Sequence, residues 1–185
     1  MTTLPIERLA RALSNCQRCP LFAHRHRMVI GTGTLPADIL FLGEGPGRSE
    51  NTSGIPFDGP SGKILDEMIL RAQQVAGLSK LPTYYITNIV LCRACDDHVG
   101  QTRDPSGAEI LCCGINVQTI IDNVQPRGVV FFGKLGRRYY GKDFENHTML
   151  SNPYYLWITG GVGSPAFATN VTLLADLFTR LTEEE

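Results

Sequence analysis

The sequence lacks the features that mark membrane, secreted and repetitive proteins. No apolar run reaches the roughly 20 residues needed to span a bilayer. The first residues, Met1–Pro5, lack the basic-then-apolar pattern of a secretory signal peptide. Internal repeats and low-complexity segments are also absent. A chain of 185 residues has the length of one domain with a sizeable core. We therefore expect a cytoplasmic monomer with no membrane partner, folded as a single domain over residues 1–185.

An excess of charge of one sign is missing as well. Lys and Arg total 17 against 18 Asp and Glu, so the net charge of −1 does not by itself predict a nucleic-acid partner. Positive charge is nevertheless clustered. Residues 1–27 contain five arginines and one glutamate, and no acid interrupts the group Lys134, Arg137, Arg138 and Lys142. Such patches follow a phosphate backbone in nucleic-acid-binding proteins, but a solvated helix face is the simpler interpretation of charge alone.

Cysteine, by contrast, is present in a number that needs an explanation. Six cysteines in a cytoplasmic protein are not expected to form lasting disulfides. Cys16 with Cys19, and Cys92 with Cys95, form two Cys-x-x-Cys pairs, which is enough for a four-cysteine zinc site. Thiolates also hold iron–sulfur clusters, so the spacing predicts a metal site without selecting the metal. The other two cysteines are adjacent in a predicted helix.

Strand-like and helix-like segments alternate along the chain. Runs rich in apolar, β-branched and aromatic residues predict strands at 38–43, 84–91, 129–132 and 148–150, with a further short candidate at 28–30. Amphipathic periodicity predicts helices at 5–14, 63–76, 107–124 and 171–181. The alternation predicts an α/β fold, a three-layer αβα sandwich with a mostly parallel four-stranded central sheet and an N-terminal metal-cluster segment.

The most informative turn follows the first of these strands. Residues Gly43–Gly47 hold three glycines and a proline, with Glu44 inside the turn and Glu50 just after it. Glycine lets a backbone pass close to a ligand, and open α/β sheets bind ligands at the carboxyl ends of their strands. On this stretch alone, a purely structural loop is an equally good interpretation.

Further motifs occur with this turn in one order along the chain. They are Cys16-x-x-Cys19, Gly43-Glu44-Gly45-Pro46-Gly47-x-x-Glu50, Pro56-Phe57-x-Gly59-x-x-Gly62, Ile86-Thr87-Asn88-Ile89-Val90-x-Cys92-Arg93 and Arg103-x-Pro105-x-x-x-Glu109-x-x-x-Cys113. Each motif alone is weak, but the collinear set resembles the family 4, iron–sulfur uracil-DNA glycosylases over most of the chain. The fold of that family, a parallel four-stranded sheet between helices, agrees with the strands predicted above.

The resemblance implies a 4Fe-4S cluster as the cofactor. The ligand positions of the family fall on Cys16, Cys19, Cys92 and Cys113. This set replaces the pairing of Cys92 with Cys95, and it leaves Cys95 and Cys112 as spare thiols. By resemblance the cluster is structural, tying the N-terminal segment to the loop after the second strand.

The resemblance also implies the activity and the partner. It indicates a monofunctional DNA glycosylase, which flips uracil or a related modified base out of single-stranded or duplex DNA and hydrolyses its N-glycosidic bond. Phe57 would stack on the flipped base, unless it is a core residue, and Asn88 would hydrogen-bond the base edge. Backbone N–H groups around Gly43 and Gly45 would contact the base or a neighbouring phosphate.

Three residues are expected to act on the glycosidic bond. Glu44 and Glu50 would orient water or stabilise positive charge on the sugar, as paired carboxylates do in glycoside cleavage. The family uses the histidine of a His-Pro motif to hydrogen-bond the leaving base, and Asn152 stands in that place here. His147 is the reserve candidate. Because a mismatch-specific branch of the superfamily carries Asn-Pro, asparagine is compatible with catalysis but leaves the preference for uracil open.

The stretch that follows is expected to contact DNA. Tyr155, Leu156 and Trp157 supply aromatic and aliphatic side chains suited to fill the gap that a flipped base leaves. A core position for Leu156 and Trp157 is the alternative. The chain also has an insertion at 96–102 relative to the family; it carries His98, and we expect a surface loop rather than a group that traps DNA covalently.

Two other functions stay open at this point. The first is a module that keeps the fold and binds DNA or uracil without turnover. The second is a metal-stabilised protein with an unrelated small-molecule activity. Retention of Glu44, Glu50, Phe57 and Asn88 favours the glycosylase, whereas Asn152 favours the binding module.

Overall fold

The computed structural model describes residues 6–97 and 100–183. Its centre is a five-stranded sheet in the order β1-β3-β2-β4-β5. The strands are β1 (Thr32–Gly33), β2 (Ile39–Gly43), β3 (Tyr84–Asn88), β4 (Gly128–Phe132) and β5 (His147–Leu150). Strands β3, β2, β4 and β5 run parallel to one another, and only β1 is antiparallel to its neighbour.

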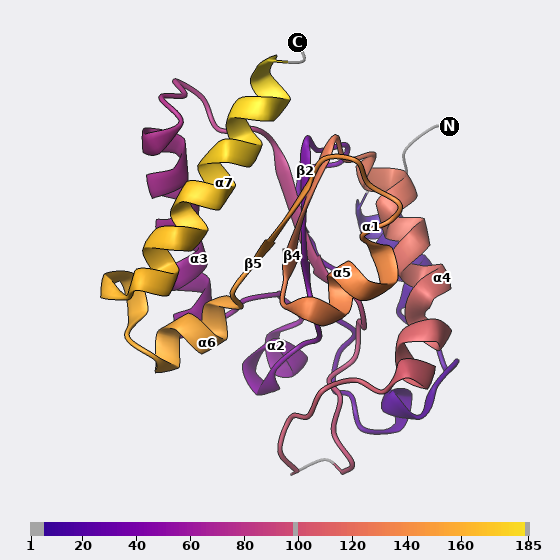
Figure 1. The fold of residues 1–185 in the computed structure, drawn as a ribbon. Coiled ribbons are helices and arrows are strands. Elements are labelled where there is room, and N and C mark those ends of the chain that lie inside the picture. Colours follow the sequence, from indigo (N-terminus) through magenta and orange to yellow (C-terminus); the bar gives the residue numbers. More distant parts are fainter. Residues whose placement is uncertain (1–5, 98–99, 184–185) are drawn as a thin grey trace.

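Helices cover both faces of this sheet (Figure 1). The α-helices are α1 (Ile6–Leu13), α2 (Arg48–Ser53), α3 (Pro60–Val75), α4 (Gly107–Val124), α5 (Lys134–Tyr140), α6 (Pro153–Ile158) and α7 (Pro165–Glu183), with short 3-10 helices η1 (Pro20–Ala23) and η2 (Gly161–Gly163). Figure 1 shows α3 and α7 on one face and α1 and α4 on the other. Within the described residues, no helix is long and apolar enough to cross a membrane.

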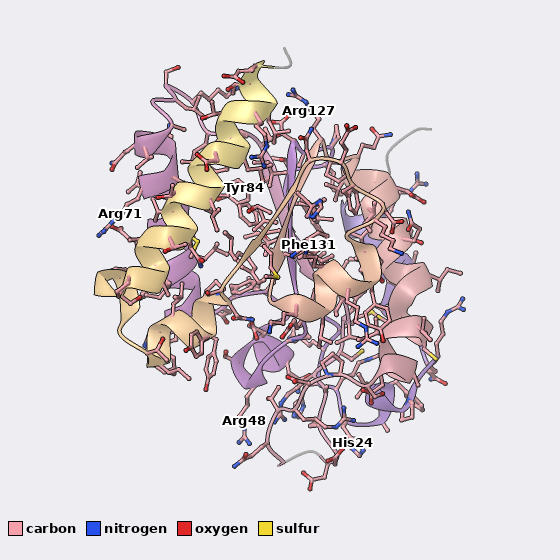
Figure 2. The ribbon with its side chains drawn as sticks, viewed as in Figure 1. His24, Arg48, Arg71, Tyr84, Arg127 and Phe131 are labelled. Atoms are coloured by element: carbon pink, nitrogen blue, oxygen red, sulfur yellow. The ribbon has the colours of Figure 1, made fainter. Side chains whose placement is uncertain are left out.

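Alternation along the central strands creates two separate cores. In β2, Leu40 and Leu42 pack toward α4, whereas Ile39 and Phe41 pack toward α3 and α7. All four side chains are buried, as expected for a parallel strand covered on both faces. Figure 2 shows Phe131 of β4 in the interior. This double burial confirms the α/β class and the layered arrangement that the sequence predicts.

The sheet departs from the prediction at its edge. The four predicted parallel strands are present, but the candidate strand at 28–30 is wrong, and Thr32–Gly33 pairs with β3 instead. Gly33 has a φ of 133°, and a Cβ atom there would lie 2.2 Å from the carbonyl oxygen of Tyr84. Only glycine allows the chain to approach β3 this closely, so a fifth strand forms where none is predicted.

Long helices are predicted better than short ones. The limits of α4 match the prediction at both ends, because Ser106 and Glu109 form a capping box at its start and Gln125 ends it in the left-handed conformation. Helices α2, α5 and α6, each of six or seven residues, are missing from the prediction. They are too short to show a helical period in the sequence. All three follow the carboxyl end of a strand, where the site lies.

Candidate active site

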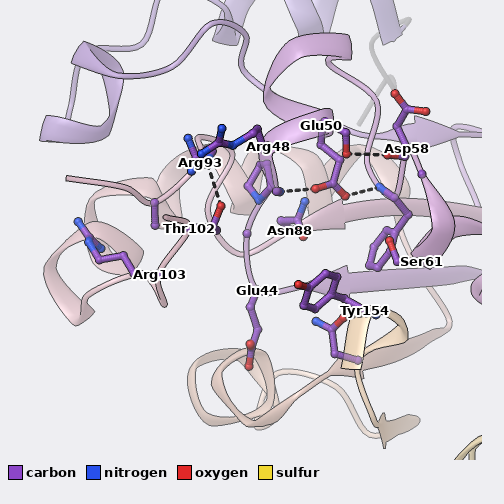
Figure 3. Close-up of a pocket in the computed structure, with 18 of the residues that line it drawn as sticks. Glu44, Arg48, Glu50, Asp58, Ser61, Asn88, Arg93, Thr102, Arg103 and Tyr154 are labelled. Atoms are coloured by element: carbon purple, nitrogen blue, oxygen red, sulfur yellow. Dashed lines mark hydrogen bonds between the residues drawn. The ribbon is translucent and has the colours of Figure 1, made fainter. Parts of the chain in front are cut away.

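A cavity of about 830 Å³ opens at the carboxyl ends of β2, β3 and β5. Its lining includes eight of the site residues predicted from the sequence, namely Glu44, Gly45, Glu50, Phe57, Asn88, Asn152, Tyr155 and Trp157. Figure 3 draws Glu44, Glu50 and Asn88 among the residues that line this cavity, together with Tyr154 of α6. The fold therefore gathers side chains separated by more than a hundred residues in the chain.

Asn88, the last residue of β3, presents an unsatisfied group to the site. Its side chain is only 2% exposed, and its amide nitrogen has no hydrogen-bond partner in the described part of the chain. The amide lies across Gly43, because a Cβ atom on Gly43 would come within 2.2 Å of the Asn88 Oδ1 atom. A buried donor without a partner is costly, and a ligand with an acceptor atom would satisfy it. Gly43 serves the site by leaving room for this amide.

Phe57 lies in a backbone conformation that non-glycine residues rarely adopt. Its φ is 55°, and left-handed residues of this kind concentrate at functional sites. The ring packs edge-on against Phe132 with 5.4 Å between the ring centroids, while the half-buried side chain still lines the cavity. Gly62 supports this arrangement, since a Cβ atom there would lie 2.0 Å from the Phe57 carbonyl oxygen. Phe57 is therefore both packed on the core and open to a ligand.

Glu50 joins two loops of the site. One carboxylate oxygen accepts the N–H of Gly47, and the other accepts the N–H of Phe57 at 2.6 Å. Burial raises the pKa of Glu50 above its ordinary value, and these two N–H groups oppose the rise. Because both oxygens are engaged by backbone donors, the geometry favours a positioning role over direct contact with a reacting group.

Glu44 is the less constrained carboxylate. One of its oxygens accepts the N–H of Leu135 at 3.3 Å, and the other has no hydrogen-bond partner among the described residues. Burial raises the pKa of Glu44, Leu135 opposes the rise, and nearby Asp104 adds to it. Gly133, at the end of β4, makes room for this side chain, because a Cβ atom there would lie 2.3 Å from the carboxylate.

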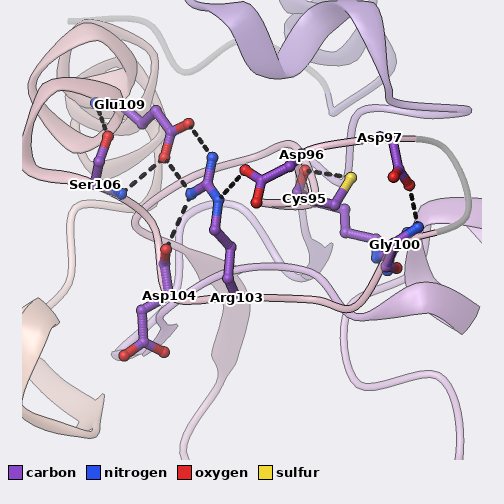
Figure 4. Close-up of polar contacts among 9 residues, drawn as sticks. Cys95, Asp96, Asp97, Gly100, Arg103, Asp104, Ser106 and Glu109 are labelled. Atoms are coloured by element: carbon purple, nitrogen blue, oxygen red, sulfur yellow. Dashed lines mark hydrogen bonds and ion pairs between the residues drawn. The ribbon is translucent and has the colours of Figure 1, made fainter.

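An arginine-rich segment forms a third side of the cavity. Arg93 is almost fully buried and donates to the Thr102 hydroxyl at 2.8 Å and to the carbonyl of Gly100. Arg103 pairs with both oxygens of Glu109 at 2.8 and 2.9 Å and thereby lowers the pKa of Glu109 to about 2 (Figure 4). These bonds fix Arg93 and residues 100–103 against the site. His98, in the predicted insertion, lies outside the described residues.

Asn152 reaches the cavity as the N-cap of α6. Its Oδ1 atom accepts the N–H of Tyr154 at 2.9 Å, which leaves the amide nitrogen as the group that can donate to a ligand. His147, the reserve candidate, does not line this cavity. It pairs with Val129, the second residue of β4, and its Nδ1 atom lies 3.0 Å from the Phe144 carbonyl oxygen.

The structure corrects the expectation for one DNA-contact residue. Leu156 has no exposed surface and packs in the core beside α3 and α7, so it cannot fill a gap in DNA in this conformation. Tyr155 and Trp157, by contrast, are 54% and 46% exposed. Because α6 is helical, its consecutive side chains point in different directions, so Leu156 faces the core while Tyr155 and Trp157 face outward.

Five of the six cysteines lie near one another: Cys16, Cys19, Cys92 and Cys113, with the exposed Cys112 beside Cys19. Burial raises the pKa of Cys113 to about 12, and the thiols of Cys92, Cys19 and Cys16 add to the rise. Cys95 is directed elsewhere, with its sulfur 3.7 Å from the Arg93 carbonyl oxygen. Within residues 6–97 and 100–183, no three His, Cys, Asp or Glu side chains are arranged to hold a metal ion as they stand.

Two N–H donors approach the sulfur atoms of this group. Arg25 donates to the Cys92 sulfur at 3.4 Å and to the Cys16 carbonyl at 2.7 Å. The buried Asn116 side chain donates to the Cys16 sulfur at 3.2 Å. Burial raises the pKa of Cys92, and the hydrogen bond from Arg25 opposes this rise, because a donor placed in this way stabilises negative charge on sulfur.

Comparison with known proteins identifies the relationship. A family model described as the uracil DNA glycosylase superfamily matches residues 30–173. The chain belongs to this superfamily. A Type-4 uracil-DNA glycosylase of Sulfurisphaera tokodaii is 32% identical over 156 residues, covering 82% of this chain and 67% of that protein. Proteins of the same name from Saccharolobus solfataricus and Thermotoga maritima are 31% and 30% identical, covering 89% and 88% of this chain and 74% and 80% of their own lengths.

Membership of the uracil-DNA glycosylase superfamily accounts for the cavity better than for the cysteines. The matched residues include every predicted residue of the cavity, whereas Cys16 and Cys19 precede the match. The sequence assigned no role to Gly133, which makes room for Glu44, to Arg48, or to the motif residue Arg93, although both arginines line the cavity. A glycine directly after a buried strand was the available signal for Gly133. The position of Arg93 depends on its bonds to Gly100 and Thr102, for which the sequence holds no local signal.

Proposed function

We propose that this protein is a monofunctional DNA glycosylase that removes uracil, or a closely related base, from DNA. The observation that carries the proposal is the unpartnered amide of Asn88, buried at the side of a cavity that also holds Phe57 and Glu44. A base edge with a carbonyl acceptor would satisfy this donor. The names of the relatives, all Type-4 uracil-DNA glycosylases, support uracil as the substrate.

A flipped base would be bound between Phe57 and the Asn88 amide. The Phe57 ring packs against Phe132, and the Phe57 N–H donates to the Glu50 carboxylate. The ring is therefore fixed in place before the base binds. Preorganised contacts of this kind avoid the cost of ordering the site during binding. Glu50 therefore contributes by keeping the stacking surface and the glycine turn in one arrangement.

Glu44 is the group we assign to the sugar and the attacking water. As the N-glycosidic bond breaks, the sugar gains positive charge and the base leaves with negative charge. The unengaged oxygen of Glu44 would stabilise the first charge or orient water, as one carboxylate does in glycoside cleavage. The amide nitrogen of Asn152 would donate to the leaving base, a contribution of a few kcal/mol in a dry site.

We further propose that Cys16, Cys19, Cys92 and Cys113 hold a 4Fe-4S cluster. The mutual proximity of the four thiols and the donors Arg25 and Asn116 support this set over one containing Cys95. When bound, the cluster would supply a cross-link between the N-terminal segment, the chain after β3 and helix α4. Cys113→Ser should lower soluble yield and iron content, because metal binding is coupled to folding.

Cys95→Ser is the matched control for that experiment and should retain iron and acid-labile sulfide. A colourless protein that holds one zinc ion and loses it in Cys95→Ser would contradict the cluster and restore the alternative pairing. The iron and sulfide contents of both variants, measured beside the native protein after anaerobic purification, decide between them.

The glycosylase proposal is tested with oligonucleotides that carry a single uracil. Alkali cleaves the strand wherever the base has been released, so a gel reports base release directly. We expect cleavage at uracil, faster from mismatched or single-stranded DNA than from a matched pair, because a poorly paired base costs less to flip. Asn88→Ala should reduce the rate, while oligonucleotides carrying only normal bases should stay intact.

One observation favours a second candidate, a module that binds DNA without turnover. Asn152 is a neutral donor where a histidine is expected, so the leaving base receives weaker stabilisation. If neither the native protein nor Asn152→His releases any base, while both bind DNA, the binding module is the correct function. Release by Asn152→His alone would locate the loss of activity at this residue.

A further inference from the structure

Helix α5 carries positive charge along one side. Lys134, Arg137, Arg138 and Lys142 are spaced at i, i+3, i+4 and i+8, which places them on one face of a helix and the turn that follows. All four side chains are exposed. In the part of the chain that the structure describes, none of them forms an ion pair.

These residues border a hollow and not a flat face. The hollow has a volume of about 510 Å³ and is closed on its other side by His147 and Met149 of the edge strand β5. No carboxylate lines it. Asp143 and Glu145, in the turn before β5, are exposed but do not contribute to the lining. Like charges held together without counter-charges repel one another, which a polyanion lying in the groove would relieve.

The hollow adjoins the active-site cavity. Glu44 lines the cavity, and its carboxylate accepts the N–H of Leu135 in the first turn of α5. The preceding residue, Lys134, lines the hollow. A DNA strand that leaves the cavity past Glu44 therefore meets Lys134, the first basic residue of α5, which directly precedes Leu135. Seven helical residues extend about 10 Å, which corresponds to roughly three nucleotides at the 3.4 Å spacing of one B-form strand.

We propose that this hollow, the α5 groove, binds phosphates of the DNA strand that flanks the nucleotide in the active site. The inference rests on the proposed function for its choice of polyanion. It adds a second contact site, so that affinity depends on the length of DNA outside the cavity. His147 belongs to this groove, where its ring also packs edge-on to Phe131 with 5.8 Å between centroids, and not to the catalytic group.

The experiment compares two double variants that remove the same amount of charge. Arg137→Gln/Lys142→Gln alters the groove, whereas Lys80→Gln/Arg180→Gln removes two exposed cations outside it. Binding of a 25-nucleotide duplex without uracil is followed by fluorescence anisotropy between 50 and 200 mM salt. Neutralising one phosphate contact lowers the slope of log affinity against log salt by about 0.9. We expect the groove variant to lose about 1.8 from the slope and the control variant to lose little.

DNA length provides the second measurement. Uracil release at low substrate concentration should fall in the groove variant by about ten-fold on a 25-nucleotide substrate, on the order expected for two lost phosphate contacts. A trinucleotide with a central uracil, too short to place two phosphates in the groove, should react at close to the native rate. Equal slopes for the two double variants, or equal losses on both lengths, would overturn the proposal. Failure of the native protein to release uracil would contradict the glycosylase function instead, and the anisotropy comparison would still report on the groove.

Discussion

The two sides of the cavity are built in different ways. Residues 43–62, which we call the turn wall, are held by backbone contacts. Glu50 accepts two backbone N–H groups. A Cβ atom added to Gly43 or Gly62 would lie 2.2 or 2.0 Å from a neighbouring atom, so only glycine fits at either position. Residues 152–158, which we call the α6 wall, are anchored by one cap hydrogen bond and by buried Leu156, and expose their aromatic rings. The turn wall fixes the positions of the groups that line the cavity, whereas the α6 wall supplies exposed side chains that can contact a ligand.

This difference predicts how the two walls respond to substitution. A change in the turn wall displaces several groups together, because backbone atoms cannot move independently. A change in the α6 wall removes one contact and leaves the rest in place. Losses of activity should therefore be steep in the turn wall and graded in the α6 wall.

The largest loss is expected for Gly43→Ala. The new methyl group would overlap the Asn88 amide, and a displacement of about 1 Å at a site can cost about 10²-fold in rate. Loss of the Asn88 hydrogen bond adds to this figure. Gly163→Ala, where no atom lies within 4 Å of a virtual Cβ, is the control. Single-turnover rates and melting temperatures are measured together, and a native rate for Gly43→Ala would show that Asn88 does not bind the base.

Asn152→Asp tests the chemical role of the α6 wall. Aspartate keeps the oxygen that caps α6 and loses the amide donor, so the melting temperature should stay close to native. The rate of uracil release should fall about 10²-fold, the usual effect of removing one donor to a developing anion. Loss of stability without loss of rate would mean that Asn152 serves only as a cap.

The sequence predicts the parts of the molecule that depend on local pattern. Strands such as β2 are recognised because parallel strands buried on both faces are continuous apolar runs, and α4 because its amphipathic periodicity extends over residues 107–124. Asn88 and Phe57 were found through collinear motifs. The direction of Leu156 was not predictable, since a six-residue helix leaves too few residues to show its period. Glu50 was found as a carboxylate, but its two backbone bonds appear only once the loops are folded.

Phe57→Ala tests a side chain of the turn wall, where Gly43→Ala tests the backbone. Base–aromatic stacking contributes roughly 1–3 kcal/mol, so we expect weaker binding or slower release within that range. Phe57 also contacts Phe132, and alanine suits its positive φ poorly, so some loss of stability is expected. Phe57→Leu keeps apolar volume without the flat ring and separates the two effects. If Phe57→Leu has native activity, the residue acts through packing and not through stacking.

The smallest effect is expected for Trp157→Ala in the α6 wall. The side chain is 46% exposed and lies beside Tyr154, with 5.8 Å between ring centroids, so alanine removes a surface ring without opening the core. Contact with unpaired bases should be worth about 1 kcal/mol, the low end of stacking, which corresponds to about a five-fold loss. The loss should appear in KM for single-stranded substrate and leave kcat near native, because the ring binds DNA and does not touch the glycosidic bond. Leu173→Ala, another exposed apolar residue outside the cavity, is the control and should change neither value. A fall in kcat for Trp157→Ala would place the ring in the chemical step, and the contrast between the two walls would then fail.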